Sequence, residues 1–234
     1  MSARPFLRAH LTVARVSNLP TVWTNVLAGI VAAGAFSWNA WWWLGVAASL
    51  LYTGGMYTND AFDAPIDAVR RSDRPIPAGE VWRSSAFVVG FALLFLGLVA
   101  ALHVRANAAV ATAGASLVGA VTYYNVRHKQ DALAPIVMGA CRGLVYILAG
   151  AAAAVVLPLA VWVGAGCVTV YVILLTVIAK RAGPRAGAVV PRLIAGISLV
   201  DAMVILFCGS FWLAVLAVLG GAVTLAGQRL VSGD

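Results

Sequence analysis

Long apolar stretches dominate the 234-residue chain, and shorter polar segments separate them. A helix that crosses a lipid bilayer needs about 20 mostly apolar residues. Runs of this kind lie at 19–36, 41–58, 84–102, 106–125, 133–154, 158–179, 192–208 and 211–227. The pattern therefore predicts an all-α integral membrane protein with about eight transmembrane helices, in a single domain that covers residues 1–234.

The connections between these runs differ in length and charge. Three long polar segments, at 59–83, 126–132 and 180–191, lie on one side of the predicted membrane, and very short turns lie on the other. Of the 16 Lys and Arg residues, all except Arg105 and Arg142 lie near the termini or on or beside these segments. Because positive residues favour the cytoplasmic side, we expect a multi-pass protein of the cell inner membrane, with both termini and the functional side in the cytoplasm.

Composition agrees with lipid as the main solvent. Hydrophobic residues make up 62% of the chain and charged residues 10%, which is too little polar surface for a soluble domain of this length. The net charge of +8 does not indicate a nucleic-acid partner, because the basic residues lie between apolar runs and not on one polar face.

Acidic residues are rare but clustered. Five of the eight lie within 21 residues after the second run: Asp60, Asp63, Asp67, Asp73 and Glu80. If that helix continues, the first three share one face at i, i+3 and i+7, and Asn59 borders it. Carboxylates held this close repel one another unless a cation intervenes, and Mg²⁺ prefers such oxygen ligands together with substrate phosphates. The spacing therefore predicts a site for Mg²⁺ and a diphosphate.

The residues that follow complete this segment. Pro65 cannot donate a backbone hydrogen bond, so we expect the helix to kink or unwind between Asp63 and Asp67. Arg70, Arg71 and Arg74 then precede a stiff Pro-Ile-Pro-Ala-Gly turn, and arginine is well suited to phosphate oxygens. The alternative is a solvated loop whose arginines neutralise its acids and face acidic lipids.

These residues carry a family resemblance. The segment NDAFDAPIDAVRRSDRPIPAGE, at 59–80, resembles the NDxxDxxxD and R-P-x-P-x-G motifs of the UbiA superfamily of intramembrane prenyltransferases. The segments ARVSNLPTVWTNVLAG, at 14–29, and YYNVRHK, at 123–129, are similar to its opening helix and its Y-x-x-x-K region. Within the superfamily, the chain resembles the small EboC-like branch most.

The resemblance implies a fold of two four-helix halves around a central lipid-facing cavity. It also implies Mg²⁺-dependent transfer of a prenyl group from an isoprenyl diphosphate to a small acceptor, with diphosphate release and membrane lipid around the protein. On the matching positions, the metal ligands are Asn59, Asp60, Asp63 and Asp67. Arg74 and Lys129 bind phosphate, and Tyr123 or Tyr124 serves the allylic cation or the acceptor; Arg70 is a further candidate for substrate binding from its place beside Arg74.

The second half departs from the family pattern. Its connecting segment, KRAGPRAG at 180–187, contains no acid where the family carries a second acidic motif. One interpretation is that Lys180, Arg181, Arg185 or Arg192 holds phosphate or binds an anionic or polyhydroxylated acceptor. The acceptor is then a small aromatic molecule or a polar one that resembles a sugar or a cyclitol. The other is a non-catalytic protein that binds or transports a prenyl lipid; a cyclase that uses the same cation is a third.

Polar residues inside the apolar runs are further candidates. Asn18, Thr21 and Asn25 form one stripe on the first run, where they line the site or join helices by hydrogen bonds.

Arg142 and Tyr146 share a face of the fifth run, and Ser198 and Asp201 share a face of the seventh. An intramembrane charge is costly unless it is paired. We therefore expect Arg142 to face the interior, as a phosphate ligand or as a partner of Asp201 or Asp131. Substrate binding is also expected of Tyr146, Ser198 and Asp201, unless their role is structural.

Overall fold

The computed structural model describes residues 3–129 and 131–231. Within them the backbone forms α-helices, two short 3-10 turns and no strand. In chain order the elements are α1 (Ala3–Val13), η1 (Val16–Asn18), α2 (Leu19–Ala32), α3 (Trp38–Arg70), α4 (Arg83–Val104), α5 (Ala108–Arg127), α6 (Ala134–Ala153), α7 (Leu159–Arg181), η2 (Gly183–Arg185), α8 (Ala186–Phe207) and α9 (Phe211–Gln228).

The predicted apolar runs correspond to α2 to α9. In the described chain five of these helices, α4, α6, α7, α8 and α9, are long and apolar enough by themselves to cross a membrane. The shorter apolar segment Val16–Ala32 contains α2. Tryptophan, glycine and tyrosine lower the hydropathy of α3, and polar residues end α5. The structure therefore agrees with a multi-span membrane protein.

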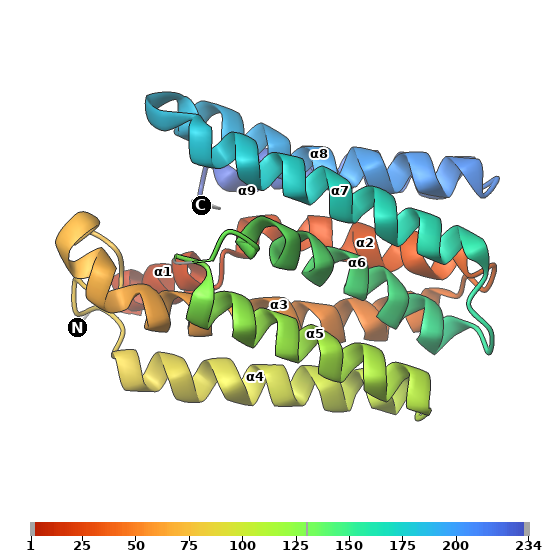
Figure 1. The fold of residues 1–234 in the computed structure, drawn as a ribbon, viewed down its shortest axis with the longest axis horizontal. Coiled ribbons are helices and arrows are strands. Elements are labelled where there is room, and N and C mark those ends of the chain that lie inside the picture. Colours follow the sequence, from red (N-terminus) through yellow and green to blue (C-terminus); the bar gives the residue numbers. More distant parts are fainter. Residues whose placement is uncertain (1–2, 130, 232–234) are drawn as a thin grey trace.

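The helices run back and forth along the long axis of the molecule (Figure 1). Connections 14–18, 71–82, 128–133 and 182–185 lie at one end, together with α1 and the last turn of α9, and connections 33–37, 105–107, 154–158 and 208–210 lie at the other end. We call the first end the Asp-rich end, because α3 delivers its acidic residues there. This arrangement matches the alternation of long and short connections along the sequence.

Helix α2 occupies the centre of the bundle. Val22, Val26 and Ile30 pack into a core that α3, α4, α5 and α6 complete. On its other side Leu27 and Val31 pack into a second core with residues of α6, α7, α8 and α9. Both apolar faces of α2 are thus buried, and α2 joins the two parts of the bundle.

Close packing fixes α3 against α4. A Cβ added at Gly54 would lie 2.7 Å from the carbonyl oxygen of Gly90. Small residues let membrane helices approach this closely. The acidic end of α3 therefore projects from a rigid helix pair.

Helix α3 does not unwind at Pro65; it continues as an α-helix to Arg70. Proline leaves the carbonyl of the residue four positions earlier without its helical partner, and here Arg83 Nε donates to the Ala61 oxygen at 2.8 Å. Unwinding between Asp63 and Asp67, one of the two expected outcomes, is thus wrong, because a side chain from α4 satisfies the freed carbonyl.

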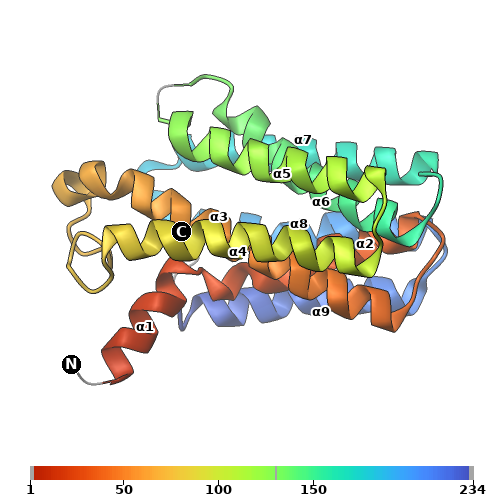
Figure 2. The same ribbon diagram turned by 90° about the horizontal axis from the view of Figure 1, so that it is seen from below.

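An additional helix precedes the bundle. The sequence pattern did not predict α1, which leaves the bundle at an angle in Figure 2. Its Ala9 and Val13 pack with Tyr57 and Ala61 of α3, and His10 Nδ1 lies 2.8 Å from the Tyr57 hydroxyl. This helix therefore covers the polar end of α3.

Candidate active site

Four polar side chains of α3 face the interior at the Asp-rich end. Asn59, Asp60, Asp63 and Asp67 are 6–8% exposed, although they lie on the last three turns of a helix that leaves the bundle. Because α3 remains helical past Pro65, all of them stay on its inner side. We call these four residues the Asp-rich cluster.

Two arginines pair with two of the carboxylates. Arg15 Nη2 lies 2.9 Å from Asp60 Oδ1, and Arg74 Nη1 lies 3.0 Å from Asp67 Oδ2 and 3.6 Å from Asp60 Oδ1. Arg15 has a φ of 45°, a left-handed conformation that residues other than glycine adopt rarely. Its backbone therefore takes an unusual turn that delivers the guanidinium to Asp60.

The third carboxylate pairs with the connection between α5 and α6. Lys129 Nζ lies 2.9 Å from Asp63 Oδ1, and His128 Nε2 lies 3.5 Å from Asp63 Oδ2. Each acid of the cluster therefore faces a cationic or imidazole group from a segment outside α3. These groups can contact phosphate as well as carboxylate.

A network of amides fixes Asn59. Its Nδ2 donates to Asn125 Oδ1 at 3.1 Å, while Asn125 Nδ2 donates to Thr58 Oγ1 at 2.8 Å and to the Gly55 carbonyl at 3.0 Å. Because the nitrogen of the Asn59 amide is engaged, its oxygen is the atom suited to a metal.

The donor chemistry of the cluster fits Mg²⁺, which prefers carboxylate and amide oxygens with room for substrate phosphates. In the described chain no three His, Cys, Asp or Glu side chains stand together in a way that could hold a metal ion as they are. The ion pairs explain this, since each carboxylate turns to its own partner. A metal would therefore bind here only as these pairs open.

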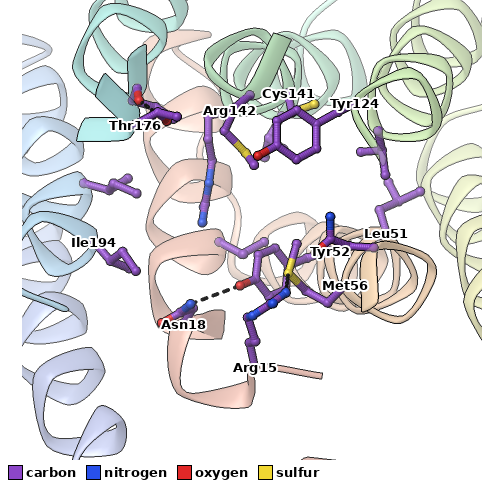
Figure 3. A pocket seen from close by; sticks show the side chains of 18 of the residues that line it. Arg15, Asn18, Leu51, Tyr52, Met56, Tyr124, Cys141, Arg142, Thr176 and Ile194 are labelled. Carbon is purple, nitrogen blue, oxygen red and sulfur yellow. Dashed lines mark hydrogen bonds between the residues drawn. The ribbon is translucent and has the colours of Figure 1, made fainter. Parts of the chain in front are cut away.

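A cavity of about 370 Å³ adjoins the cluster (Figure 3). Its walls come from α2, α3, α5, α6, α7 and α8 and are mainly apolar, with Leu51, Val145, Leu175, Ile194 and Ile197 among them. Asn59 and Arg15 border it, so the cluster and the cavity form one site.

A second carboxylate lies deeper in the bundle. Asp201 is fully buried, and both its oxygens accept from Asn25 Nδ2, at 2.8 and 2.9 Å. Thr24 Oγ1 donates to Oδ2 at 2.6 Å, and the Tyr146 hydroxyl donates to Oδ1 at 2.5 Å. Ser198 Oγ lies 3.1 Å from Thr24 Oγ1. We call these five residues the Asp201 network; in the described chain the groups that donate to Asp201 itself are all neutral.

Arg142 joins this network without touching the acid. Its Nη1 donates to Asn25 Oδ1 at 2.8 Å and its Nη2 to Thr21 Oγ1 at 3.1 Å. The guanidinium also lies over the Tyr52 ring, 5.6 Å from the ring centre. Among the described residues no direct ion pair links Arg142 to Asp201 or Asp131. Asn25 therefore mediates the expected partnership with Asp201.

The structure separates the two candidate tyrosines. Tyr124 lines the cavity and stacks on His128, with ring centres 4.7 Å apart. Tyr123 is 45% exposed and donates to Asp131 Oδ2 at 2.6 Å. That bond and the backbone amide of Leu133 hold the pKa of Asp131 below its ordinary value. Tyr124 is thus the tyrosine of this pair placed to contact a ligand.

The basic residues of the second half, which the sequence predicted to hold phosphate or an acceptor, do not reach the cavity. The side chains of Lys180, Arg181, Arg185 and Arg192 are exposed and do not line the cavity. Residues such as Thr176 and Ala179 of α7 and Val190 of α8 line that side. Arg70 is likewise exposed, whereas Arg74 reaches the cluster.

Several residues that line the site were not predicted from the sequence. Arg15, Tyr52, Asn125 and His128 all line the cavity. Arg15, Asn125 and His128 lie inside the segments that carried the family resemblance, which was the available signal. Tyr52 looked like one more residue of an apolar run.

Comparison with known sequences identifies the family. The sequence profile of the UbiA prenyltransferase family matches residues 18–232. The digeranylgeranylglyceryl phosphate synthase of Methanopyrus kandleri is 36% identical over 99 residues, which are 42% of this chain and 36% of that protein. The protein of the same name from Natronomonas pharaonis is 31% identical over 147 residues, or 62% of this chain and 53% of that one. These matches thus span about a third to a half of the relatives' lengths.

Solved structures show the same fold. A structure described as a UbiA homolog from Archaeoglobus fulgidus bound to DMAPP and Mg²⁺ superposes with a TM-score of 0.65 at 13% identity, covering 95% of this chain and 99% of the other. The same homolog bound to GPP and Mg²⁺ gives 0.62 at 15% identity, covering 95% and 86%. The profile match over nearly the whole sequence, supported by this shared fold, shows that the chain belongs to the UbiA prenyltransferase family.

Proposed function

We propose that the protein is an intramembrane prenyltransferase, which moves a prenyl group from an isoprenyl diphosphate to a small acceptor and releases diphosphate. One observation carries this proposal: three buried carboxylates and their cationic partners stand at the border of a mainly apolar cavity. A groove that only binds lipid does not need the charged cluster, and the active site of a soluble enzyme with a polar substrate does not need the apolar cavity.

The Asp-rich cluster is the diphosphate end of the site. Asn59, Asp60, Asp63 and Asp67 would hold Mg²⁺, which when bound neutralises negative charge on the diphosphate leaving group. Arg15, Arg74 and Lys129 pair with these carboxylates, and with the carboxylates on a metal they would be available to contact phosphate oxygens. Their charge stabilises the leaving group as it departs.

The cavity handles the prenyl group. The bond between the allylic carbon and the diphosphate oxygen breaks, and its electron pair leaves with the diphosphate. Apolar walls keep water from the allylic cation, and the faces of Tyr52 and Tyr124 can attract it. The acceptor then forms a bond to that carbon and loses a proton.

For the acceptor we propose a small aromatic or polar molecule, the latter sugar-like or cyclitol-like. Polar side chains among the apolar cavity lining, such as Asn18 and Thr176, support a molecule with hydrogen-bonding groups. The matched relatives are named for a product with a glyceryl phosphate group, which adds phosphate-bearing acceptors to the range to be tried.

We further propose that α2 to α9 all cross the cell inner membrane as two four-helix halves. The Asp-rich end then lies on the cytoplasmic side. The basic connections at that end support this orientation. Single cysteines introduced at Arg71 and Asn107 should react with a membrane-impermeant thiol reagent from opposite sides. Labelling of both from the same side would contradict the orientation.

The deciding experiment uses purified protein in nanodiscs with Mg²⁺, radiolabelled dimethylallyl, geranyl and geranylgeranyl diphosphates, and a cell lipid extract as acceptor source. We expect diphosphate release and a new labelled product, both abolished by Asp63→Ala and preserved by Asp73→Ala, because Asp73 is exposed. A non-catalytic carrier would bind the donors without release and tolerate Asp63→Ala, and that outcome would overturn the proposal. A product formed without acceptor would indicate a cyclase.

A further inference from the structure

The charges that line the cavity are unbalanced. Among the described residues, Arg15 and Arg142 are its only Lys, Arg, Asp or Glu side chains. In Figure 3 the two arginines reach toward the middle of the cavity from opposite walls. The cavity itself is therefore electropositive, and the two guanidinium groups differ in what neutralises them.

Arg15 is paired, whereas Arg142 has only neutral partners. Arg15 forms an ion pair with Asp60. Arg142 has five N–H donors, and two of them donate to Asn25 and Thr21. A guanidinium inside the membrane without a carboxylate in contact is costly, so an anion that enters the cavity gains a strong partner.

The Asp201 network explains why Arg142 stays there. Asp201 already accepts from Asn25, Thr24 and Tyr146, so its oxygens are engaged. Its effect on Arg142 passes through Asn25, whose Nδ2 donates to the carboxylate while its Oδ1 accepts from the guanidinium. The acid thus orients the amide, and the amide orients the arginine.

The position of Arg142 separates it from the diphosphate end. Arg142 lies over Tyr52, which precedes Asn59 on α3 by seven residues and so lies on the order of 10 Å deeper in the bundle. Tyr52 and Val145 lie beside it. An anion on Arg142 would therefore occupy a place distinct from that of a diphosphate at the Asp-rich cluster.

We propose that Arg142 binds an anionic group of the acceptor, a phosphate or carboxylate, and that Asp201 acts through Asn25 as the residue that positions it. This inference rests on the proposed prenyl transfer and specifies the chemistry of its acceptor. The anion can be the headgroup of a membrane lipid or part of a small water-soluble molecule.

Binding of defined probes tests this site. Protein in a non-ionic detergent is titrated with dioleoyl phosphatidic acid, oleate and the uncharged dioleoylglycerol, and then with inorganic phosphate as the free anion. We expect wild type to bind at least one anionic probe about 10-fold tighter than dioleoylglycerol, because a hydrogen-bonded charge is worth about that much. A preference for the lipids over inorganic phosphate would indicate a lipid acceptor, and the reverse a soluble one.

Variants then assign the preference. Arg142→Gln should remove the preference for the anion while binding of dioleoylglycerol is unchanged, and Arg142→Lys should restore part of it. Asp201→Asn should reduce the same ratio by less, since Asn25 keeps one acceptor. Arg71→Gln, an exposed arginine at the Asp-rich end, is the matched control. An Arg142→Gln protein that folds and keeps the full preference would overturn the proposal.

A further variant separates this inference from the function on which it rests. Asp63→Asn should lose prenyl transfer yet keep the preference for the anion, because Asp63 contacts Lys129 and not Arg142. If wild type shows the Arg142-dependent preference but no transfer with any donor, the anion site stands and the proposed function fails. If transfer occurs and Arg142→Gln leaves the KM for the acceptor unchanged, the inference fails and the function stands.

Discussion

The protein treats its buried carboxylates in two different ways. At the Asp-rich cluster, cationic side chains from outside α3 pair with Asp60, Asp63 and Asp67. In the Asp201 network, threonine, asparagine and tyrosine donors surround a single acid. Burial is similar, but the partners differ in charge and in mobility.

This difference separates an exchangeable site from a fixed one. Long side chains such as Lys129, which is 31% exposed, can leave a carboxylate for a phosphate and gain a similar interaction. The donors around Asp201 sit on two helices in the middle of the bundle, α2 and α6, and have no such alternative. The first region is thus suited to ligands, and the second holds α2, α6 and α8 together.

Neutralising the central acid of the cluster should have the largest effect. Asp63→Asn keeps the shape of the side chain but removes a metal ligand, so we expect prenyl transfer to fall by at least about 100-fold. The assay is release of diphosphate at saturating donor. Asp73→Asn is the control, and an Asp63→Asn protein with near-normal turnover would show that the cluster is structural.

Removing the deep acid should act on stability. Asp201→Ala leaves the Asn25, Thr24 and Tyr146 donors buried without their acceptor, and we expect a loss of about 3 kcal/mol in the free energy of unfolding. Unfolding in mixed micelles with increasing sodium dodecyl sulfate measures this. Asp201→Asn should lose less, and equal stability of wild type and Asp201→Ala would argue against the structural role.

Removing the positive charge of Arg15 should change the affinity for Mg²⁺ by a moderate amount. Arg15→Gln breaks the ion pair with Asp60, so Mg²⁺ alone should bind several-fold more tightly while a diphosphate binds more weakly. Calorimetry with Mg²⁺, with inorganic diphosphate and with both measures the two effects. Unchanged Mg²⁺ affinity would mean that Arg15 does not compete with the metal.

The exposed basic segment should matter least. Exposed charges are screened by salt and contribute little singly, so Lys180→Gln combined with Arg181→Gln should change turnover by less than about twofold. Arg74→Gln, which breaks contacts with Asp60 and Asp67, should cost much more. A large loss in the double variant would show that this segment folds over the cavity when substrate binds.

Local patterns predicted the helices well because burial in lipid requires continuous apolar runs. The spacing of Asp60, Asp63 and Asp67 likewise predicted a shared face, which α3 retains. Unwinding at Pro65 does not occur because Arg83, a residue of the next helix, satisfies the freed carbonyl. That contact joins residues 22 positions apart and leaves no local pattern.

Contacts between distant segments account for the rest of the site. Arg15 meets Asp60 across 45 residues, and Arg142 meets Asn25 across 117. Such pairs depend on which faces of which helices meet in the packed bundle, and helical periodicity does not specify that. Lys180 shows the converse, since its charge indicated a ligand site but packing left it exposed.

The sequence by itself determined the lipid-embedded helical architecture, the acidic face of α3 and the family motif, because hydropathy and helical spacing act over a few turns. The tertiary structure decided which cations pair with those acids, which tyrosine faces the cavity and how Asp201 holds Arg142 through Asn25. Those outcomes depend on side chains from separate helices meeting at hydrogen-bonding distance, which only the packing of α2, α3, α6 and α8 brings about.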